Sequence, residues 1–359
     1  MTAIRPMPSS VVLEVMHRGV VIPACPLALD ENRRFDEVHQ KALIRYYGAA
    51  GAGGVAVGVH TTQFEIRDPA IGLFKPVLQL AAEAIDGEIR IHGRPIVKIA
   101  GVCGRTRQAV AEAEYAASLG YDMVLLSLAA LPDASDDDLI EHCERVSAIM
   151  PIIGFYLQPA VGGRILPYSF WQRFVQIPNV VAIKIAPFNR YFTLDVVRAV
   201  AQAGVEDRVA LYTGNDDAII IDLLTPYAIR TDAGEKVLRI KGGLLGQWSI
   251  WTSKAVELLN EIHAAVEGNS ATIAELLKKN AGLTDANAAV FDAAHNFAGC
   301  IPGINEVLRR QELMRSGHCL DPTLSLSLGQ AEAIDRVCRD YPWLTDDEFV
   351  REHLDEWLR

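Results

Sequence analysis

The sequence lacks an excess of basic residues and lacks any long apolar run. Lysine and arginine together number 34, against 45 aspartate and glutamate residues, and the formal net charge is −11. Surfaces that bind nucleic acid are usually basic, so we expect no nucleic-acid partner. No stretch approaches the roughly 18–20 apolar residues of a membrane-spanning helix, and residues 1–6 lack the apolar core of a signal peptide. We therefore predict a cytoplasmic location and no membrane partner.

The sequence also lacks the short motifs that mark disulfides, metal sites and dinucleotide sites. Its six cysteines include no CxxC pair, and thiols in a cytoplasmic protein are the simplest interpretation. Its nine histidines show neither HxxxH nor HExxH spacing, so we predict no metal site. No GxGxxG pattern follows a strand-like run, which counts against a dinucleotide-binding fold.

The chain is long and apolar enough to bury a large core. It has 359 residues, of which 50% are hydrophobic, which suits one large α/β domain with an appendage, or two domains. Strand-like runs occur at residues 19–23, 53–59, 95–100, 122–127, 152–156, 180–186, 208–212 and 242–245. Helix-like segments occur at residues 35–47, 73–85, 106–119, 136–150, 168–175, 193–203, 216–224 and 248–265. Eight such pairs favour an α/β fold of the (β/α)8 TIM-barrel type over a doubly wound sheet.

Two segments depart from this alternation. Residues 227–241 contain Thr231-Asp232-Ala233-Gly234 between short apolar runs, which predicts a hairpin inserted before the last strand. From about residue 267 onward the pattern is only helical. We therefore predict a barrel over residues 1–265 and a C-terminal helical domain over residues 266–359. Within the barrel, Thr106 is expected to cap a helix that Gly120 ends.

The run 180–186 is a short apolar stretch with one lysine, Lys184, in its middle. An apolar, partly β-branched run between Pro178 and Pro187 is typical of a buried parallel strand. One interpretation is a lysine at a strand end whose ammonium reaches water or a carboxylate. The other is an amine kept partly neutral by loss of hydration, which can attack a carbonyl and form an imine. Lowering a lysine pKa from about 10.4 to about 7 corresponds to about 4–5 kcal/mol.

Other polar residues follow the predicted strands where a barrel of this type carries its active site. The strand ends carry His60-Thr61-Thr62, Tyr156 and Gly214-Asn215-Asp216. Each also has a structural interpretation, since a threonine pair serves turns, a tyrosine at a strand end is often half-buried core, and Gly-Asn-Asp often caps a helix. Together they would place hydroxyls, backbone N–H groups and an amine around one barrel mouth.

At this point the chain resembles the dihydrodipicolinate synthase / N-acetylneuraminate lyase family of class I aldolases. The resemblance runs from about Val20 to the C-terminal helices. Its most specific element is Tyr156 followed 28 residues later (184 − 156) by Lys184 in an Ile-Lys context. The pair Thr61-Thr62 comes next, and residues 214–217 look like the Gly-Asp-Asp of the family.

The resemblance implies a chemistry for these residues. Lys184 would form a Schiff base with pyruvate or another 2-oxo acid, with no cofactor beyond this imine, and Tyr156 would relay protons. Thr61 and Thr62 would bind the carboxylate, with His60 nearby. The remaining substrate-binding residues would be Gly214, Asn215, Leu244 and Arg164. The resemblance also implies a homo-oligomer, commonly a tetramer.

The chain departs from the family at several positions. His60 stands in place of the usual glycine before the threonine pair, and Gln63-Phe64 in place of Gly-Glu. Residues 128–131 read Leu-Ala-Ala-Leu where the synthases carry a tyrosine pair. Gly162-Gly163 shifts the loop that carries Arg164. Gln247 and Trp248 are expected to line the distal part of the pocket, although a core tryptophan is an equal alternative.

Three functions are consistent with these residues. The first is a Schiff-base lyase, either an aldolase or a hydro-lyase, that acts on a 2-oxo acid. The second is dihydrodipicolinate synthase itself, which the departure at residues 128–131 disfavours. The third is a catalytically silent barrel that binds a 2-oxo acid as a sensor or partner protein, which a buried amine disfavours.

Overall fold

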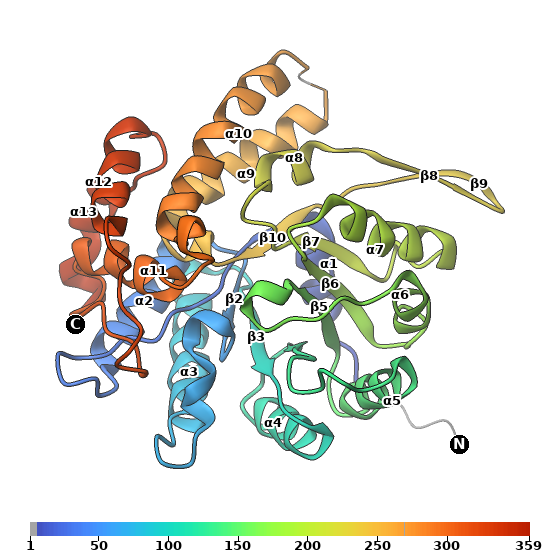
Figure 1. Ribbon diagram of the computed structural model, residues 1–359, viewed down its shortest axis with the longest axis horizontal. Helices are drawn as coiled ribbons and strands as arrows, with labels where there is room; N and C mark the ends of the chain where they lie inside the picture. The colour runs from blue at the N-terminus through green and yellow to red at the C-terminus, as the bar shows by residue number, and fades with distance from the viewer. Residues whose placement is uncertain (1–5, 269) are drawn as a thin grey trace.

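Eight parallel strands form a closed barrel in the computed structural model, which describes residues 6–268 and 270–359 (Figure 1). The strands are β1 (Val21–Pro23), β2 (Gly54–Val57), β3 (Val97–Val102), β4 (Met123–Leu126), β5 (Ile152–Leu157), β6 (Val180–Ala186), β7 (Ala210–Thr213) and β10 (Gly242–Leu245). Their order is β1-β10-β7-β6-β5-β4-β3-β2. Backbone hydrogen bonds close the ring between β1 and β2, since Gly53 N–H donates to Val21 O at 3.0 Å and Cys25 N–H donates to Ala56 O at 2.8 Å. The predicted barrel is confirmed.

Helices follow the strands and cover the outside of the barrel. They are α2 (Glu37–Ala49), α3 (Phe74–His92), α4 (Thr106–Ser118), α5 (Asp136–Ser147), α6 (Tyr168–Phe174), α7 (Arg190–Ala203), α8 (Ile219–Leu224) and α9 (Thr252–Val266). Short 3-10 turns are η1 (His60–Thr62), η2 (Phe64–Arg67), η3 (Pro159–Val161), η4 (Gln247–Ser249) and η5 (Ala293–His295). None of the helices in residues 6–268 and 270–359 is long and apolar enough to cross a membrane. The predicted absence of a signal peptide concerns residues 1–6, of which 1–5 lie outside the described residues.

A helix that the sequence analysis did not predict, α1 (Ser10–Arg18), precedes the first strand. The Ser9 side chain caps it by accepting from Val12 N–H at 3.3 Å. Its apolar side chains, Val12, Val15 and Met16, belong to the same buried cluster as the interior of the barrel. The helix therefore closes the end of the barrel opposite the strand ends that carry the site.

Each barrel strand is buried on both faces, and its side chains alternate between two cores. Ile153, Phe155 and Leu157 of β5 belong to the interior cluster. Tyr156, between them, belongs to the outer cluster that the strands share with the surrounding helices. Because side chains alternate along a strand, a shift of one residue moves a side chain from the interior to the helix layer.

The predicted hairpin is present as β8 (Tyr227–Thr231) paired antiparallel with β9 (Gly234–Leu238). Gly234 has a φ of 114°, which a glycine adopts without strain and which closes the two-residue turn. The Thr231 hydroxyl donates to Gly234 O at 2.8 Å across the turn. Figure 1 shows the hairpin extending away from the barrel beyond α7.

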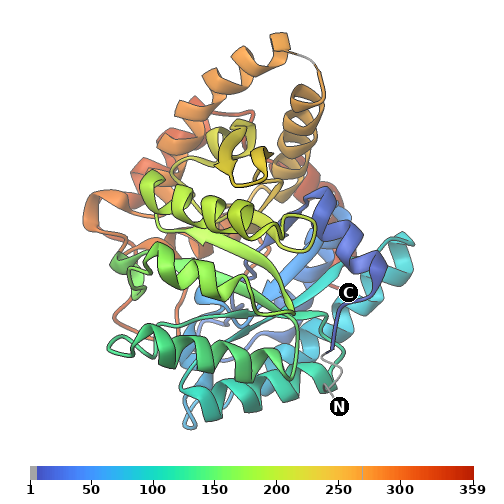
Figure 2. The same cartoon turned by 90° about the vertical axis from the view of Figure 1, so that its right-hand side faces the viewer.

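The chain after α9 folds into four helices that lie against one side of the barrel (Figures 1 and 2). They are α10 (Ser270–Val290), α11 (Cys300–Arg310), α12 (Gln330–Asp340) and α13 (Asp347–Trp357). Asp346, which is 2% exposed, accepts hydrogen bonds from Tyr46 Oη at 2.7 Å and Ser253 N–H at 3.1 Å. The Trp357 ring packs 5.5 Å from the Tyr46 ring, so the C-terminal helices share a core with α2.

The predicted cap of α4 is wrong. Arg105, in an extended conformation, is the residue before the helix and makes no side-chain cap, whereas Thr106 is already helical. The Thr106 hydroxyl hydrogen-bonds His142 Nδ1 of α5 at 2.9 Å. The Thr106 side chain therefore connects α4 to α5 and does not accept a hydrogen bond from a free backbone N–H at the start of its own helix.

Candidate active site

A cavity opens at the carboxyl ends of the barrel strands. It is lined by Ala24, Val59, His60, Thr61, Phe155, Leu157, Gln158, Val161, Lys184, Ala186, Phe188, Gly214, Asp216, Gly246, Phe291, Phe297, Cys300 and Ile304. The cavity volume open to the centres of water molecules is about 70 Å³. The barrel supplies the floor and walls, and the segment from Phe291 to Ile304 covers the mouth.

Lys184 projects from β6 into this cavity and is 8% exposed. It is in register with Phe155 on β5 and Tyr212 on β7, and its Nζ lies 4.5 Å from the centre of the Phe155 ring. Gly214 leaves room for the lysine, since a Cβ on Gly214 would lie 2.6 Å from Lys184 Cε. Among the described residues the amine has no hydrogen-bond or ion-pair partner. Burial lowers the pKa of the Lys184 ammonium, and the Asp216 carboxylate opposes this shift.

A second ionisable side chain, Asp216, also lines the cavity. The sequence analysis named its neighbours Gly214 and Asn215 as substrate-binding residues but did not name Asp216. Gln247 N–H donates to its Oδ1 at 3.2 Å. Burial raises the pKa of the Asp216 carboxyl, against the opposing effect of Lys184. The Gly-Asn-Asp motif after β7 was the signal that could have identified it.

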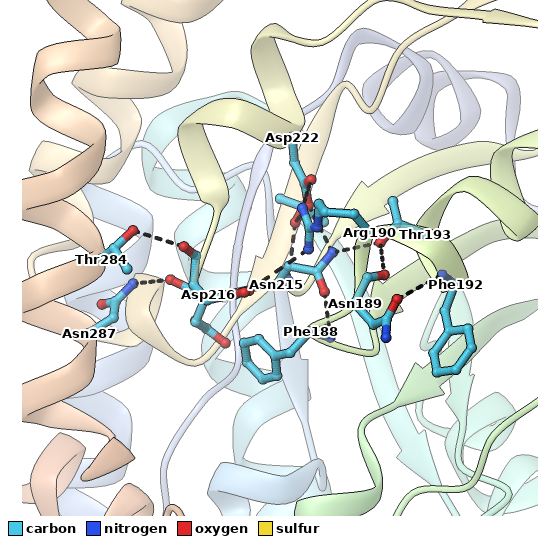
Figure 3. A network of polar contacts seen from close by, with 12 residues as sticks. Phe188, Asn189, Arg190, Phe192, Thr193, Asn215, Asp216, Asp222, Thr284 and Asn287 are labelled. Carbon is cyan, nitrogen blue, oxygen red and sulfur yellow. Dashed lines mark hydrogen bonds and ion pairs between the residues drawn. The ribbon is translucent and has the colours of Figure 1, made fainter. Parts of the chain in front are cut away.

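The loop that carries Asp216 is held from both sides (Figure 3). On one side, α10 of the C-terminal domain contributes Asn287, whose Nδ2 donates to Asp216 O at 2.6 Å, and Thr284, whose hydroxyl donates to Asp217 O at 2.8 Å. On the other side, Asn215 Nδ2 donates to Asp222 Oδ2 at 2.8 Å, and Asn215 Oδ1 accepts from Phe188 N–H at 2.9 Å. Asn215 therefore holds the loop and, in contrast to its predicted substrate contact, does not line the cavity.

The predicted carboxylate-binding residues are only partly in the cavity. His60 and Thr61 line it, and the Thr61 hydroxyl donates to Ala24 O at 2.6 Å. Thr62 instead turns into the η1 segment, where its hydroxyl donates to Cys25 O at 2.7 Å and accepts from Gly58 N–H at 2.9 Å. Thr62 is thus a structural residue. Burial lowers the pKa of the His60 imidazole to about 4, with Lys184 adding to the effect, so His60 is neutral at pH 7.

Tyr156, the predicted proton relay, does not line the cavity that Lys184 faces. Its ring packs among the helices, 5.2 Å from Trp171 and 5.9 Å from Phe192. Its hydroxyl donates to Leu166 O at 3.2 Å and accepts from Leu166 N–H at 3.3 Å. The cause is strand register: Phe155 is the partner of Lys184, so the next residue points outward.

The remaining predicted contacts also lie away from the cavity. Arg164 Nη1 donates to Leu131 O at 2.6 Å and Ala134 O at 3.1 Å, so the guanidinium holds the preceding loop. Leu244 belongs to the barrel interior, and Gly246, two residues later, takes the lining position. Trp248 is buried in the outer core, and neither it nor Gln247 lines the cavity.

Aromatic and apolar residues that the sequence analysis did not single out make up most of the upper wall. The Phe188 and Phe297 rings stack with centres 5.8 Å apart and an interplanar angle of 12°. Phe291, Cys300 and Ile304 line the cavity from the C-terminal domain. A helical tail carries no sequence signal that places it over a barrel mouth, so these residues could not have been found without the structure.

No group of three metal-ligating side chains comes together within residues 6–268 and 270–359. The polar groups that face the cavity are one amine, one carboxyl, one imidazole, one amide, one hydroxyl and one thiol. This set can form an imine, bind a small carboxylate and exchange protons.

Comparison with solved structures confirms the fold. A dihydrodipicolinate synthase superposes with a TM-score of 0.70 at 17% identity, over 90% of this chain and 99% of that one. A prophage protein of the dihydrodipicolinic acid synthase family from E. coli K12, solved with pyruvate, gives 0.72 at 17% identity, over 90% and 98%. N-acetylneuraminate lyase from Fusobacterium nucleatum gives 0.70 at 16% identity, over 90% and 99%.

Sequence comparison finds relatives at low identity, among them two from Clostridium species. The 4-hydroxy-tetrahydrodipicolinate synthase of Clostridium tetani is 27% identical over 148 residues, 41% of this chain and 47% of the relative. That of Clostridium perfringens is 28% identical over 146 residues, 40% and 48%. The chain thus aligns with about half the length of these relatives. The model of the Dihydrodipicolinate synthetase family matches residues 17–226, more than half of the 359 residues. This protein belongs to the dihydrodipicolinate synthetase family.

Proposed function

We propose that this protein is a Schiff-base lyase in which Lys184 forms an imine with pyruvate or another 2-oxo acid. Membership of the family supports a class I aldolase or lyase. The observation that carries the proposal is a buried lysine amine that faces the cavity at the carboxyl ends of the barrel strands and has no hydrogen-bond or ion-pair partner among the described residues. An amine without a partner is costly to bury as ammonium, and the neutral amine is the nucleophile.

The cavity suits the first steps of this chemistry. The Lys184 amine attacks the keto carbon, and the resulting iminium draws electrons from the neighbouring carbon. The carboxylate of the substrate would accept a hydrogen bond from the neutral His60 imidazole. It would accept a second from the Thr61 hydroxyl after that hydroxyl turns from Ala24 O.

The side chains on the distal wall of the cavity determine which substituent on the keto carbon of the substrate can be bound. Leu157, Val161, Phe188, Phe297 and Ile304 supply apolar surface there. Arg164, the residue expected to bind a second charged group, is occupied with loop carbonyls. The proposed substrate or aldehyde acceptor is therefore apolar at this end, since a buried charge without a partner is strongly disfavoured.

Borohydride reduction in the presence of pyruvate tests the proposal. The wild-type protein is expected to gain the mass of one reduced pyruvate adduct, whereas Lys184→Ala gains none. Lys241→Ala is the matched control, because Lys241 is exposed and lies outside the cavity. Absence of an adduct with every 2-oxo acid tried would remove the proposal.

A catalytically silent 2-oxo-acid-binding barrel is the second candidate function. The observation in its favour is that Tyr156, the expected proton relay, lies outside the cavity. It predicts binding of pyruvate by calorimetry without a borohydride-trapped adduct. Dihydrodipicolinate synthase activity proper is disfavoured, because the loop at residues 128–131 has no tyrosine and Arg164 is turned away.

Two further properties are proposed. The family resemblance implies a homo-oligomer, dimer or tetramer, and the six free cysteines favour a cytoplasmic location. Sedimentation at micromolar concentration tests the first, and a monomer there would contradict it.

A further inference from the structure

The cavity pairs a lysine with a carboxyl and, within residues 6–268 and 270–359, receives no tyrosine hydroxyl. We propose that Asp216 is the general acid–base of this site, and that it moves protons between the Lys184 amine and the substrate. This inference rests on the proposed imine chemistry and assigns a catalytic role to a residue of the same site.

The geometry leaves one oxygen of Asp216 available. Gln247 N–H holds Oδ1 at 3.2 Å, and Oδ2 has no hydrogen-bond partner among the described residues. Asp216 and Lys184 line the same cavity and interact electrostatically without forming a direct ion pair. The keto oxygen of a substrate attached to Lys184 could therefore lie between them. Asn287 fixes the Asp216 backbone from α10, so the carboxyl is held in place before substrate arrives.

The other titratable groups nearby are less suited to the task. His60 is neutral, and its pKa of about 4 makes it a weak base. Burial raises the pKa of the Cys300 thiol, which keeps its proton. Asp217 lies outside the cavity, with its Oδ1 3.9 Å from Arg190 Nη2. Burial moves the pKa of Asp216 up and that of Lys184 down, so the pair can exchange one proton near neutral pH.

Asp216 alone can donate and accept every proton that imine formation requires. As the Lys184 nitrogen bonds to the keto carbon, the carbonyl π pair moves to oxygen, which takes the proton of the Asp216 carboxyl. The carboxylate then removes a proton from the carbinolamine nitrogen and returns it to the hydroxyl. The carbon–oxygen bond breaks, water leaves and the iminium remains. The carboxylate can next accept a proton from the adjacent carbon, which gives the enamine.

Timed borohydride quenching after mixing with pyruvate measures the rate of imine formation. In Asp216→Asn we expect the rate at pH 7 to fall by about 100-fold or more, since general acid–base catalysis commonly contributes about 10²–10⁴-fold. Long incubation should still give an adduct on Lys184. Asp217→Asn, the matched control one residue away, should stay within about twofold of wild type, as expected of an exposed side chain outside the cavity. Asp216→Glu keeps an ionising group and should be faster than Asp216→Asn.

An electrostatic role alone predicts the opposite result. Without the carboxylate, the pKa of Lys184 falls further, so the fraction of neutral amine rises and Asp216→Asn would form the imine as fast as wild type or faster. That outcome would overturn the proposal. If the wild type forms no adduct at all, the proposed function fails instead, so the two failures are distinct.

The wild-type pH profile gives a test that does not depend on the folding of a variant. With Asp216 as the acid, the rate should rise and then fall between pH 5 and pH 10, because the acid form is lost as the amine becomes neutral. A rate that increases steadily over this range would overturn the proposal.

Discussion

At the scale of single residues, strand register separates the two side chains that the sequence pattern places together. Lys184 lies on β6 and Tyr156 on the neighbouring strand β5, each near the strand end at the barrel mouth. Because Phe155 is the residue in register with Lys184, the Tyr156 ring enters the helix layer. The spacing of 28 residues (184 − 156) carries no information on which face each residue takes, since the pairing shifts by one residue at the start of β5.

Tyr156→Phe tests this placement. We expect the variant to retain its rate of imine formation and to lose about 1–3 kcal/mol of unfolding free energy, because the Leu166 N–H and C=O both lose their partner. Timed borohydride trapping and urea denaturation measure the two effects. A large loss of rate without loss of stability would show that the hydroxyl acts in the cavity after all.

His142 is expected to make the fold sensitive to acid. Its buried imidazole shares a 2.9 Å hydrogen bond with Thr106, its Nε2 has no partner, and burial lowers its pKa to about 4. Between pH 6.5 and pH 4, His142 is therefore protonated in the unfolded chain but not in the native state. The free energy of unfolding falls as the pH falls through this range. Over pH 7 to 4.5 this amounts to about 2 kcal/mol, from roughly 1.4 kcal/mol per pKa unit.

Removing the imidazole tests this effect. His142→Gln should shrink the difference in unfolding free energy between pH 7 and pH 4.5 by about 2 kcal/mol. Comparing variant with wild type cancels the opposite contribution of Asp222 and Asp346, whose pKa values burial raises. An unchanged difference would mean that His142 does not titrate as described.

At the scale of elements, the alternation of apolar runs and helical segments predicted the barrel, and the hairpin followed from its turn residues. Elements buried on both faces leave continuous apolar runs, so β6 could be recognised from its sequence. Helix α1 was missed because it precedes the first strand and so lies outside the strand–helix alternation, and its role depends on covering the far end of the barrel. The cap at Thr106 failed because a threonine side chain can also bond a neighbouring helix.

The contact between α10 and the Asp216 loop could not be predicted from the sequence, because Asn287 is 71 residues (287 − 216) from its partner.

Asn287→Ala removes the hydrogen bond that holds the Asp216 carbonyl at 2.6 Å. We expect imine formation to slow by about tenfold or more, since small displacements of a catalytic group are costly. Lys278→Ala is the control on the same helix, because this side chain is exposed. Equal rates in both variants would show that α10 does not position the loop.

At the scale of the whole molecule, the C-terminal helices complete both the core and the site. Helix α11 supplies Cys300 and Ile304 to the cavity, the segment between α10 and α11 supplies Phe291 and Phe297, and α13 packs Trp357 against Tyr46. The sequence pattern indicated a helical tail and nothing about where it docks, because amphipathic helices do not record their partner surface.

Asp346 makes buried polar contacts between the C-terminal helices and the barrel. Its carboxylate accepts from Tyr46 Oη at 2.7 Å, Ser253 N–H at 3.1 Å and Gln311 Nε2 at 2.9 Å. Asp346→Ala leaves these buried donors without a partner, and we expect a loss of about 3 kcal/mol or more. Urea denaturation measures it, with Asp355→Ala on the exposed face of α13 as control. A loss below about 0.5 kcal/mol, the usual effect at an exposed site, would mean that the tail docks without this contact.

The measurement that tests the account most directly is the position of the borohydride-trapped adduct in the chain. Wild-type protein is reduced in the presence of pyruvate, digested, and its peptides are mapped by mass spectrometry. We expect a single modified lysine, Lys184, because its amine faces the cavity without a hydrogen-bond or ion-pair partner among the described residues. Lys98 is paired with Asp86 at 2.7 Å and Lys241 is exposed, so neither should react selectively. An adduct on Lys98 or Lys241, or no adduct with any 2-oxo acid tried, would contradict it.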